Sequence, residues 1–580
     1  MGGKRFGSDL IVDVIKQYDF EYATLNPGSS FRGLHDSLVN YGGNVRPAII
    51  ECPHENTAIG MAHGYAKVTG KPLLAILHDL VGLLHACLAI YYAYQDRVPM
   101  VVAGATGPMD LTRRRPHIDW IHTALVQGNA VRDYVKWDDQ PYGVRAVPDS
   151  FARAYRVANT EPKGPTYICF DVDLQEDPFE EEVRLPDVGK LLPPTPIQAD
   201  ARAIDTAARL LVGAKNPVIV ADYLGRNRES VRELVGLSEL LSVPVIDLMS
   251  RFNFPAVHPL DLTGSDCLHS ADLLLALDVR DLTKATTERD IHTKQVRTVL
   301  PGDCKVVEMG LSDLGISSWS AQYGKLSEVD LSVLCDTSIA LPELTRRCRE
   351  LLSEADGERD GMTRRFEALR RKHESTRAAS QEEAHRNWDA RPMTPARLAF
   401  ELGEAISGED WVLTANTLYG WARRLWQWDE PYRHAGESLG TGTQLNISLG
   451  VALAYKGTGR LVVDIQPDGD LMFDASALWV ASHYRIPLLV VMLNNRAYRN
   501  SWHHQAALAR KRGNPIERAN IGTELTGPAP DFASLARSFG WYAEGPIEDG
   551  SKVADAVKRA LQVLKNEGRP ALVDTVTALD

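Results

Sequence analysis

Residues 461–495 read LVVDIQPDGDLMFDASALWVASHYRIPLLVVMLNN and carry the strongest structural signal in the sequence. Two short apolar runs, Leu461–Ile465 and Leu488–Leu493, flank a helical pattern, which is typical of two parallel strands joined by a helix. The carboxyl ends of parallel strands meet at one edge of a sheet, so Asp468 and Asn495 are expected to lie close together there. A carboxylate and an amide oxygen in that place suit Mg2+, which is usually bound by few protein oxygens together with phosphate oxygens.

The same alternation of short apolar runs and helical patterns continues outward through the whole chain. Besides the two runs above, strands are predicted at Tyr22–Leu25, Ala48–Ile50, Leu73–Leu77, Met100–Ala103, Thr166–Phe170, Pro217–Ala221, Val243–Asp247, Leu273–Asp278, Trp411–Thr414 and Ala571–Val576. This pattern predicts an α/β fold of three doubly wound parallel-sheet domains. We place the domains at residues 1–185, 195–355 and 375–580.

Three charged or proline-rich stretches are best explained as surface features. Glu176–Asp200 is acidic and then rich in proline, which predicts a linker across the surface. Arg346–Arg391 combines Glu with Arg and Lys at helical spacings and predicts a solvated helical connector. The run Arg113-Arg114-Arg115 could meet an acidic substrate, but a solvated loop is the simpler interpretation.

Composition and charge argue against several classes of protein. With 64 Lys and Arg against 76 Asp and Glu, the net charge is −12, which argues against nucleic-acid binding through phosphate neutralisation. The seven cysteines are scattered and form no C-x-x-C pair, which gives no support to a disulfide framework or a structural zinc site. No apolar run approaches the ~20 residues of a membrane span. Met1–Gly7 lead into no apolar signal segment, so we expect a cytoplasmic protein without membrane or nucleic-acid partners.

A second segment with chemical potential lies far earlier in the chain. The strand that ends at Ile50 is followed by Glu55 and then by AIGMAHGYAKVTG, a helical stretch rich in small residues at Ala58–Gly70. A carboxylate at the start of a helix can simply stabilise the helix terminus. In an apolar pocket, however, the pKa of a glutamate rises into a range that suits proton exchange near neutrality.

Together the two segments resemble the signature of the thiamine diphosphate-dependent enzymes, the family of acetolactate synthase, pyruvate decarboxylase and benzoylformate decarboxylase. The separation of Asp468 and Asn495, 495 − 468 = 27 residues, fits the family pattern of GDG followed by NN. The resemblance implies that the Asp468 carboxylate, the Asn495 side chain and the Ala497 backbone carbonyl bind Mg2+. It also implies that Glu55 protonates the aminopyrimidine ring of the cofactor, which then removes the C2 proton of the thiazolium to give the ylid.

The resemblance also implies an order of domains: pyrimidine-binding, middle and diphosphate-binding. Specific stretches look most like benzoylformate decarboxylase, namely Asn26–Ser29 (NPGS), Leu77-His78 and Ala477–Pro487. In that enzyme the serine and the histidine face the substrate, which makes Ser29 and His78 candidates for binding the substrate carboxylate and transferring protons. A loop serine and a structural histidine are the alternatives for these two residues.

Two positions in the turn after Ile465 depart from the family pattern. Pro467 stands where the family has its first glycine, and the turn keeps its shape only if that position has a negative φ and donates no essential N–H. Asp470, often serine in the family, would lie near the diphosphate. A carboxylate is unfavourable there unless a metal or a helix terminus offsets its charge.

Other site residues follow from the resemblance by position. The segment Leu439-Gly440-Thr441 is expected beneath the cofactor, with Thr441 where the family has a bulkier Leu, Met or Ile. Asn416 and the turn residues Gly469 and Asp470 are expected at the diphosphate. The substrate entrance is expected to be lined by Ser501, Trp502 and His504.

The sequence leaves three functions open. The first is decarboxylation of a 2-oxo acid, or its ligation to an aldehyde or ketone acceptor, through the C2 ylid and an enamine. The second is an acetolactate synthase-like transferase, and the third is a non-catalytic relative, which Pro467 and Thr441 motivate. The middle block lacks a glycine-rich dinucleotide turn, so no FAD is expected. Because the family pairs its two cofactor-binding domains across subunits, we expect a homodimer or a homotetramer.

Overall fold

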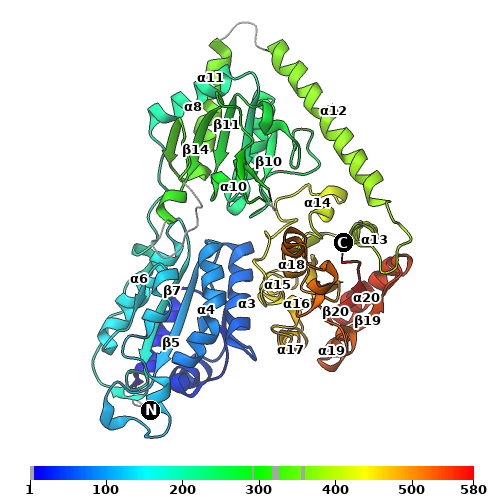
Figure 1. The fold of residues 1–580 in the computed structure, drawn as a ribbon. Coiled ribbons are helices and arrows are strands. Elements are labelled where there is room, and N and C mark those ends of the chain that lie inside the picture. Colours follow the sequence, from blue (N-terminus) through cyan, green and yellow to red (C-terminus); the bar gives the residue numbers. More distant parts are fainter. Residues whose placement is uncertain (1–4, 291–292, 316–325, 355–358, 580) are drawn as a thin grey trace.

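The computed structural model describes residues 5–290, 293–315, 326–354 and 359–579, and Met1–Lys4 lie outside these ranges. Its strands form three parallel sheets, each flanked by helices, at residues 22–171, 217–334 and 411–576 (Figure 1). The predicted fold class, α/β with three doubly wound parallel sheets, is therefore confirmed. Among the described residues, no helix combines the length and the apolar character that a membrane crossing requires.

The first domain is built on a six-stranded parallel sheet in the order β3-β2-β4-β5-β7-β6. Its strands are β2 (Tyr22–Leu25), β3 (Ala48–Glu51), β4 (Leu74–Ile76), β5 (Met100–Thr106), β6 (Asp138–Asp139) and β7 (Pro165–Asp171). The main helices are α1 (Gly7–Gln17), α3 (Glu55–Thr69), α4 (Leu80–Gln95) and α6 (Val147–Asn159). The strand order reverses between β2 and β4, and open α/β sheets bind ligands at such a point, just beyond the carboxyl ends of the strands.

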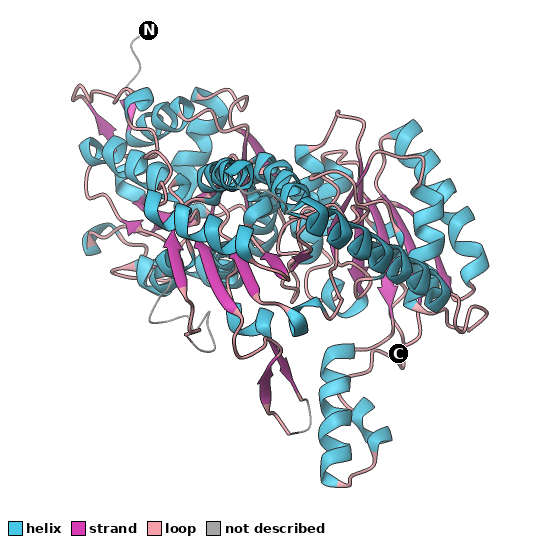
Figure 2. Cartoon of the chain, turned by 90° about the horizontal axis from the view of Figure 1, so that it is seen from above, coloured by secondary structure: helices cyan, strands magenta, loops and turns pink. Residues whose placement is uncertain are grey.

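The middle domain has a five-stranded parallel sheet in the order β10-β9-β11-β14-β15. Its strands are β9 (Pro217–Ala221), β10 (Val245–Asp247), β11 (Leu273–Leu277), β14 (Lys305–Gly310) and β15 (Leu331–Leu334). Its main helices are α8 (Ala201–Gly213), α9 (Arg228–Leu241) and α11 (Thr337–Glu354). A two-stranded hairpin, β12 (Thr287–Arg289) with β13 (Val296–Thr298), projects from the body of the molecule (Figure 2).

The third domain has a five-stranded parallel sheet in the order β16-β17-β18-β20-β19. Its strands are β16 (Trp411–Ala415), β17 (Leu461–Pro467), β18 (Leu489–Asn494), β19 (Tyr542–Ile547) and β20 (Ala571–Val576). Its main helices are α13 (Pro395–Ile406), α15 (Gln444–Ala454), α16 (Asp468–Leu471), α17 (Ala477–His483), α18 (Arg499–Arg512) and α20 (Val553–Glu567). Pro467 pairs with Leu493, so the carboxyl ends of β17 and β18 lie side by side, as the sequence predicts.

The long helix α12 (Arg359–Ala384) runs from the middle domain to the third domain (Figure 1). Near its start, Arg365 donates to the carbonyl oxygens of Ser242 at 2.9 Å and Lys215 at 2.8 Å. Near its end, Glu383 forms an ion pair with Arg424 of the third domain. Of the charged connector predicted at Arg346–Arg391, residues 346–354 belong to α11, residues 355–358 lie outside the described residues, and residues 359–384 form α12. Several of its charges contact the domains that it joins rather than water alone.

The first and third domains of one chain meet along α3 and α15 (Figure 1). Glycines allow the two helices to approach closely, since a Cβ atom added at Gly64 would lie 1.9 Å from the carbonyl oxygen of Ile447. At Gly450 an added Cβ would lie 2.1 Å from the carbonyl oxygen of Met61. The small residues that are prominent in the sequence of α3 therefore serve this contact.

Gly64→Ala is expected to destabilise the chain by about 3 kcal/mol, because the helices must separate to admit the methyl group. The apparent melting temperature measured by calorimetry should then fall by several degrees. Gly213→Ala is the matched control, since an added Cβ there meets nothing within 4 Å. Equal melting temperatures for the two variants would contradict the close helix contact.

Candidate active site

Asp468, Asn495 and Ala497 converge at the ends of β17 and β18. The Ala497 N–H lies 3.1 Å from Asp468 Oδ2 and 3.0 Å from Asn495 Oδ1, so one N–H group holds both oxygens in place. A second backbone N–H, from Gly469, donates to Asp468 Oδ1 at 2.8 Å. Asp468 is 1% exposed, and burial raises the pKa of its carboxyl group to about 6. A carboxylate oxygen and an amide oxygen brought together in a buried place fit the donor set of a Mg2+ site.

Pro467 fits the turn that carries Asp468. Its backbone has φ −65° and ψ 141°, and this φ is the value that the proline ring imposes. The position forms the N-cap of α16, and the residue ends β17 in parallel register with Leu493. Of the two conditions that the sequence analysis set for this departure from the family pattern, the first, a negative φ, is met.

Asp470 has a structural role that accounts for its carboxylate. It accepts hydrogen bonds from the N–H of Gly442 at 2.7 Å, the N–H of Gln444 at 3.3 Å and the side chain of Gln466 at 3.1 Å. Two of these donors lie at the amino end of α15, where the helix dipole favours a negative charge. The charge of Asp470 is thus compensated by its own chain at the start of α15.

Asp470→Ala is expected to cost about 3 kcal/mol of stability, because it leaves buried donors without an acceptor. Asp200→Ala is a suitable control, since Asp200 caps α8 from an exposed position and its loss should cost only about 1 kcal/mol. Urea denaturation of both variants measures the difference. If Asp470→Ala lowers the free energy of unfolding by no more than Asp200→Ala does, the hydrogen bonds of Asp470 do not hold the loop before α15 in place.

Strained backbone lies near the candidate metal ligands Asp468 and Asn495. Among non-glycine residues, φ is +61° at Ala415, +56° at Tyr419, +56° at Thr441 and +57° at Arg496. Left-handed conformations of such residues cost free energy, and they cluster at functional sites where the surrounding structure enforces them. Ala415 ends β16, Tyr419 follows β16, Arg496 follows β18, and Thr441 lies just before α15. The strain therefore marks the same edge of the third sheet as Asp468.

The residues expected beneath the cofactor contact the first domain. The Thr441 hydroxyl lies 2.6 Å from the hydroxyl of Tyr92 on α4, and the Leu439 side chain is 47% exposed. Gly440 and Gly442 have φ of +80° and +83°, which gives the loop a sharp bend on either side of Thr441. Asn416 lies in the loop after β16, where its side-chain oxygen accepts from the N–H of Leu418 at 2.7 Å.

Glu55 is the first residue of α3 and is 5% exposed. The N-cap of this helix is His54, whose side chain accepts from the N–H of Asn56 at 3.0 Å. The interpretation of Glu55 as a helix-cap residue is therefore not needed to explain how α3 begins. Its Oε2 lies 3.1 Å from Nδ1 of His85 on α4. The carboxyl group is thus buried beside an imidazole.

His78 follows β4 and lies near Glu55. A Cβ atom added at Gly82 would be 2.8 Å from His78 Cβ and 2.9 Å from Glu55 Oε1, so both residues border one glycine. His78 Nδ1 is hydrogen-bonded to the hydroxyl of Ser30 at 2.7 Å. The structure therefore brings Glu55 and His78 together, with Ser30 rather than Ser29 in contact with the histidine. Ser29 is exposed and lines a separate hollow with Arg32.

The residues expected at the substrate entrance lie on α18, which begins directly after Tyr498. Ser501 and His504 are exposed, and Trp502 is half-buried. Two aromatic residues lie beside the turn that carries Asp468: Tyr498, with which the region predicted to line the substrate entrance begins, and Phe473, which sequence reasoning missed. A Cβ atom added at Gly469 would lie 2.7 Å from the Tyr498 ring, and that ring contacts Phe473 at 6.3 Å between centroids.

Residues next to Glu55 also contact the third domain of the same chain. The Asn56 side chain donates to the carbonyl oxygen of Gly442 at 2.9 Å, and the Thr57 hydroxyl donates to Asp474 at 2.7 Å. The amino end of α3 therefore sits on the loop that precedes α15. Neither contact was predicted, because each joins residues that lie several hundred positions apart in the sequence.

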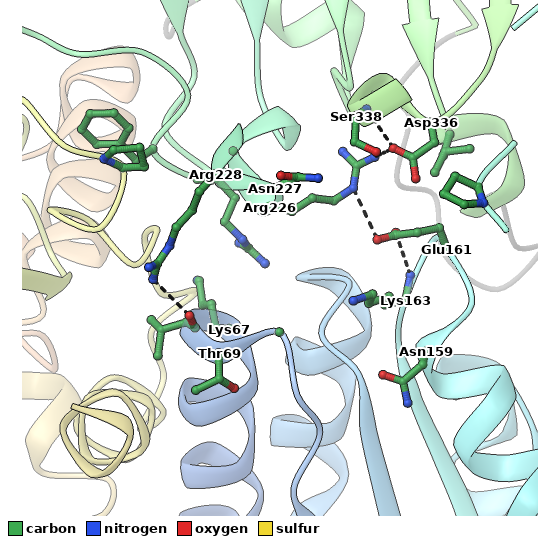
Figure 3. A pocket seen from close by; sticks show the side chains of 18 of the residues that line it. Lys67, Thr69, Asn159, Glu161, Lys163, Arg226, Asn227, Arg228, Asp336 and Ser338 are labelled. Atoms are coloured by element: carbon green, nitrogen blue, oxygen red, sulfur yellow. Dashed lines mark hydrogen bonds and ion pairs between the residues drawn. The ribbon is translucent and has the colours of Figure 1, made fainter. Parts of the chain in front are cut away.

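A cavity of about 700 Å³ lies at the junction of the three domains (Figure 3). Arg226 of the middle domain crosses it, with Glu161 of the first domain 3.5 Å away and Asp336 3.0 Å away. Arg228 donates to the carbonyl oxygen of Val68 at 3.1 Å. The described residues that line this cavity include none of the site residues discussed above, so these ion pairs hold the domains together at a separate place.

Comparisons with known proteins cover both ends of the chain. The family described as "Thiamine pyrophosphate enzyme, N-terminal TPP binding domain" matches residues 5–127, and "Thiamine pyrophosphate enzyme, C-terminal TPP binding domain" matches residues 416–575. Glu55 and His78 fall in the first range, and Asp468, Asn495 and Ala497 fall in the second.

Whole-chain similarities point the same way. A probable acetolactate synthase large subunit of Methanococcus aeolicus is 25% identical over 602 residues, covering 98% of this chain and 91% of that protein. The acetolactate synthase large subunit of Haemophilus influenzae is 23% identical, covering 93% and 89%. The crystal structure of benzoylformate decarboxylase from Polynucleobacter necessarius has the same fold, with a TM-score of 0.76, 18% identity and 99% coverage of each chain. Because both cofactor-binding domains are present in one chain and in this order, the chain belongs to the thiamine pyrophosphate enzymes.

Proposed function

We propose that the chain is a carbon–carbon lyase that decarboxylates a 2-oxo acid with thiamine diphosphate and Mg2+, and that it can join the product to an aldehyde or ketone acceptor. The observation that carries the proposal is the convergence of Asp468 and Asn495 on one N–H group at the edge of the third sheet. It is supported by a buried glutamate, Glu55, in the other cofactor-binding domain. A cytoplasmic location stays a prediction.

Each residue has a stated task in this proposal. Asp468, Asn495 and the carbonyl of Ala497 would hold Mg2+ and with it the diphosphate, and Glu55 would exchange a proton with the aminopyrimidine ring. Bound thiamine diphosphate supplies a carbon nucleophile and accepts the electrons released when CO2 leaves. His78, half-buried beside Glu55, would hold and move a proton at the substrate. Ser29, Asn416, Leu439, Gly440, Thr441, Ser501, Trp502 and His504 stay predicted contacts.

An acetolactate synthase-like transferase is the second candidate, because several relatives carry that name. A panel of 2-oxo acids that includes pyruvate and benzoylformate, with and without an aldehyde, separates the two when products are read by mass spectrometry. Acetolactate from pyruvate alone would favour the transferase, and an aldehyde from one acid would favour the lyase. Failure to bind thiamine diphosphate with Mg2+ in calorimetry would instead favour a non-catalytic relative.

A second subunit is part of the proposal. Several large apolar side chains beside the site are exposed in the single chain, among them Leu84 and Leu88 of α4 and Leu439, Met472 and Phe473 of the third domain. Exposed apolar patches of this kind mark protein interfaces. We infer that another copy of the chain covers them, so that Glu55 of one subunit and Asp468 of the other serve one cofactor in a homodimer or homotetramer. The alternative is a site closed within one chain, next to the contact of Asn56 with Gly442.

Mixing Glu55→Gln with Asp468→Ala chains decides between these arrangements. If sites form across subunits, each mixed dimer regains one intact site, and random exchange restores roughly a quarter of wild-type activity. If sites form within one chain, every chain carries a defect and activity stays at background. Native mass spectrometry first confirms that subunits exchange. Complete exchange without recovery of activity would show that the cross-subunit site is wrong.

A further inference from the structure

His78 belongs to a group of three ionisable side chains, together with Asp79, which follows it, and His122, which lies after β5. Asp79 Oδ1 is 3.7 Å from His78 Nδ1, and Asp79 Oδ2 is 3.6 Å from Nδ1 of His122, at the end of the short helix α5 (Asp119–His122). The two imidazole rings lie edge to face, with centroids 5.3 Å apart. One carboxyl group therefore stands between two imidazoles, at the point where the order of the first sheet reverses.

Ser30 fixes the orientation of the His78 ring. The Asp79 N–H donates to Ser30 Oγ at 3.0 Å, and the same oxygen is hydrogen-bonded to His78 Nδ1 at 2.7 Å. A hydroxyl can either donate to Nδ1 or accept from it, so this contact suits both the neutral and the protonated ring. Nε2, at the end of the ring opposite Ser30, is then the nitrogen that meets the substrate.

Asp79 is an unusual carboxyl group for a structural residue. It is 1% exposed, and within the described part of the chain neither its Oδ1 nor Nδ1 of His122 has a hydrogen-bond partner. Burial raises the pKa of Asp79 to about 7, and burial lowers the pKa of His78. An acid and a base whose pKa values approach each other can exchange charge near neutral pH. A carboxyl group that served only to hold the fold would be expected to have donors on both oxygens.

Other charged and titratable groups face this cluster from neighbouring segments. They are Glu55 of α3, Arg115 of the loop after β5, Asp119 of α5, and Tyr167 and Cys169 of β7. Arg115 is paired with Asp119 at 2.7 Å, which leaves its charge largely compensated. Burial raises the pKa of the Cys169 thiol to about 12 and also raises that of the Tyr167 hydroxyl, so both groups stay neutral at physiological pH. The charge balance of His78 is thus set by Asp79, His122 and Glu55.

We propose that Asp79 is the shared counter-charge of His78 and His122, so that the three side chains take up and release protons as one unit beside the substrate. The inference rests on the proposed function, because His78 is the member that meets the substrate there. Protonated His78 gives its Nε2 proton to the substrate, which leaves the neutral ring with its proton on Nδ1, and Nε2 later regains a proton from water. Ionised Asp79 favours the protonated ring and protonated His122 opposes it. Asp79 and His122 are therefore positioning residues that act through His78.

The proposal predicts shifts of opposite sign for the two neighbours of His78. Asp79→Asn removes a negative charge less than 4 Å away, which should lower the pKa of His78 by about one unit. The charge of the His122 ring lowers the pKa of His78, so His122→Gln should raise that pKa. The shifts are read from the limb of the kcat/KM pH profile that disappears in His78→Ala. The substrate is whichever of pyruvate and benzoylformate the wild-type holoenzyme decarboxylates faster, and Asp79→Glu should restore most of the wild-type profile.

A matched control and a substrate-free measurement complete the test. Asp222→Asn replaces another buried aspartate, 4% exposed and directly after β9 in the middle domain, and should leave the profile unchanged. The pH titration of the His78 ring carbon by NMR, on histidine-labelled holoenzyme, should show the same opposite shifts without any substrate. Shifts of equal sign, or none with Asp79→Asn, would overturn the proposal. Exchange of the C2 proton of the bound cofactor distinguishes a failure of this proposal from a failure of the proposed function. If the wild-type holoenzyme shows no such exchange, the proposed function itself is wrong.

Discussion

Glu55→Gln is expected to slow the exchange of the C2 proton of bound thiamine diphosphate for deuterium by at least about 100-fold, the usual contribution of a placed acid–base group. The amide keeps the shape of the side chain but cannot deliver and take back a proton. Glu55 is 5% exposed, so water has little access to replace it. The exchange rate is measured by proton NMR on acid-quenched samples of the holoenzyme.

Glu51→Gln is the matched control, because Glu51 ends the preceding strand β3 and is exposed. It should show wild-type exchange. Circular dichroism and cofactor titration should find both variants folded and able to bind thiamine diphosphate. If Glu55→Gln exchanges at the wild-type rate but melts at a lower temperature, the glutamate only stabilises the start of α3, and the proton-exchange role is wrong.

The interior strands could be predicted because they are buried on both faces. Every residue of β9 and of β11, two interior strands of the middle sheet, is buried, and each strand appears in the sequence as a continuous apolar run. The strands that were not predicted lie toward or at the edges of the sheets. In β15 only one residue of four is buried, and β19 contains Glu, Gly and Pro in six residues. Edge strands need fewer apolar residues, so their sequences resemble loops.

The same contrast holds for the candidate site. The closeness of Asp468 and Asn495 follows from local pattern and parallel register alone, and the sequence predicted it. The contact of Ser30 with His78 depends on which of two adjacent serines in the turn Ser29–Phe31 is turned inward, and no pattern in the sequence distinguishes them. The partners of Asp470 lie 26 and 28 residues earlier in the chain, in a loop whose path only the tertiary structure determines.

Replacement of Asp468, the carboxylate proposed to bind Mg2+, is the second change with a large expected effect. Asp468→Ala should weaken Mg2+-dependent binding of thiamine diphosphate at least about 100-fold, since even outer-shell changes at metal sites cost 10–100-fold. Asp468 supplies the only full negative charge assigned to the protein's share of the site, so Asn495 and a carbonyl oxygen cannot replace it. Isothermal titration of the apoprotein, with Mg2+ and with EDTA, measures the affinity.

Asp464→Asn controls for the loss of a buried carboxyl group in β17, the strand that leads to Asp468. Asp464 lies four residues earlier on β17, and burial raises its pKa well above the ordinary value. The group is therefore held in its neutral form, which an asparagine imitates, and Mg2+-dependent binding should not change. Equal losses of cofactor affinity in the two variants would mean that the integrity of β17, and not the Asp468 carboxylate, governs Mg2+-dependent binding. Unchanged affinity in Asp468→Ala would place the metal elsewhere, and would remove the observation on which the proposed function depends.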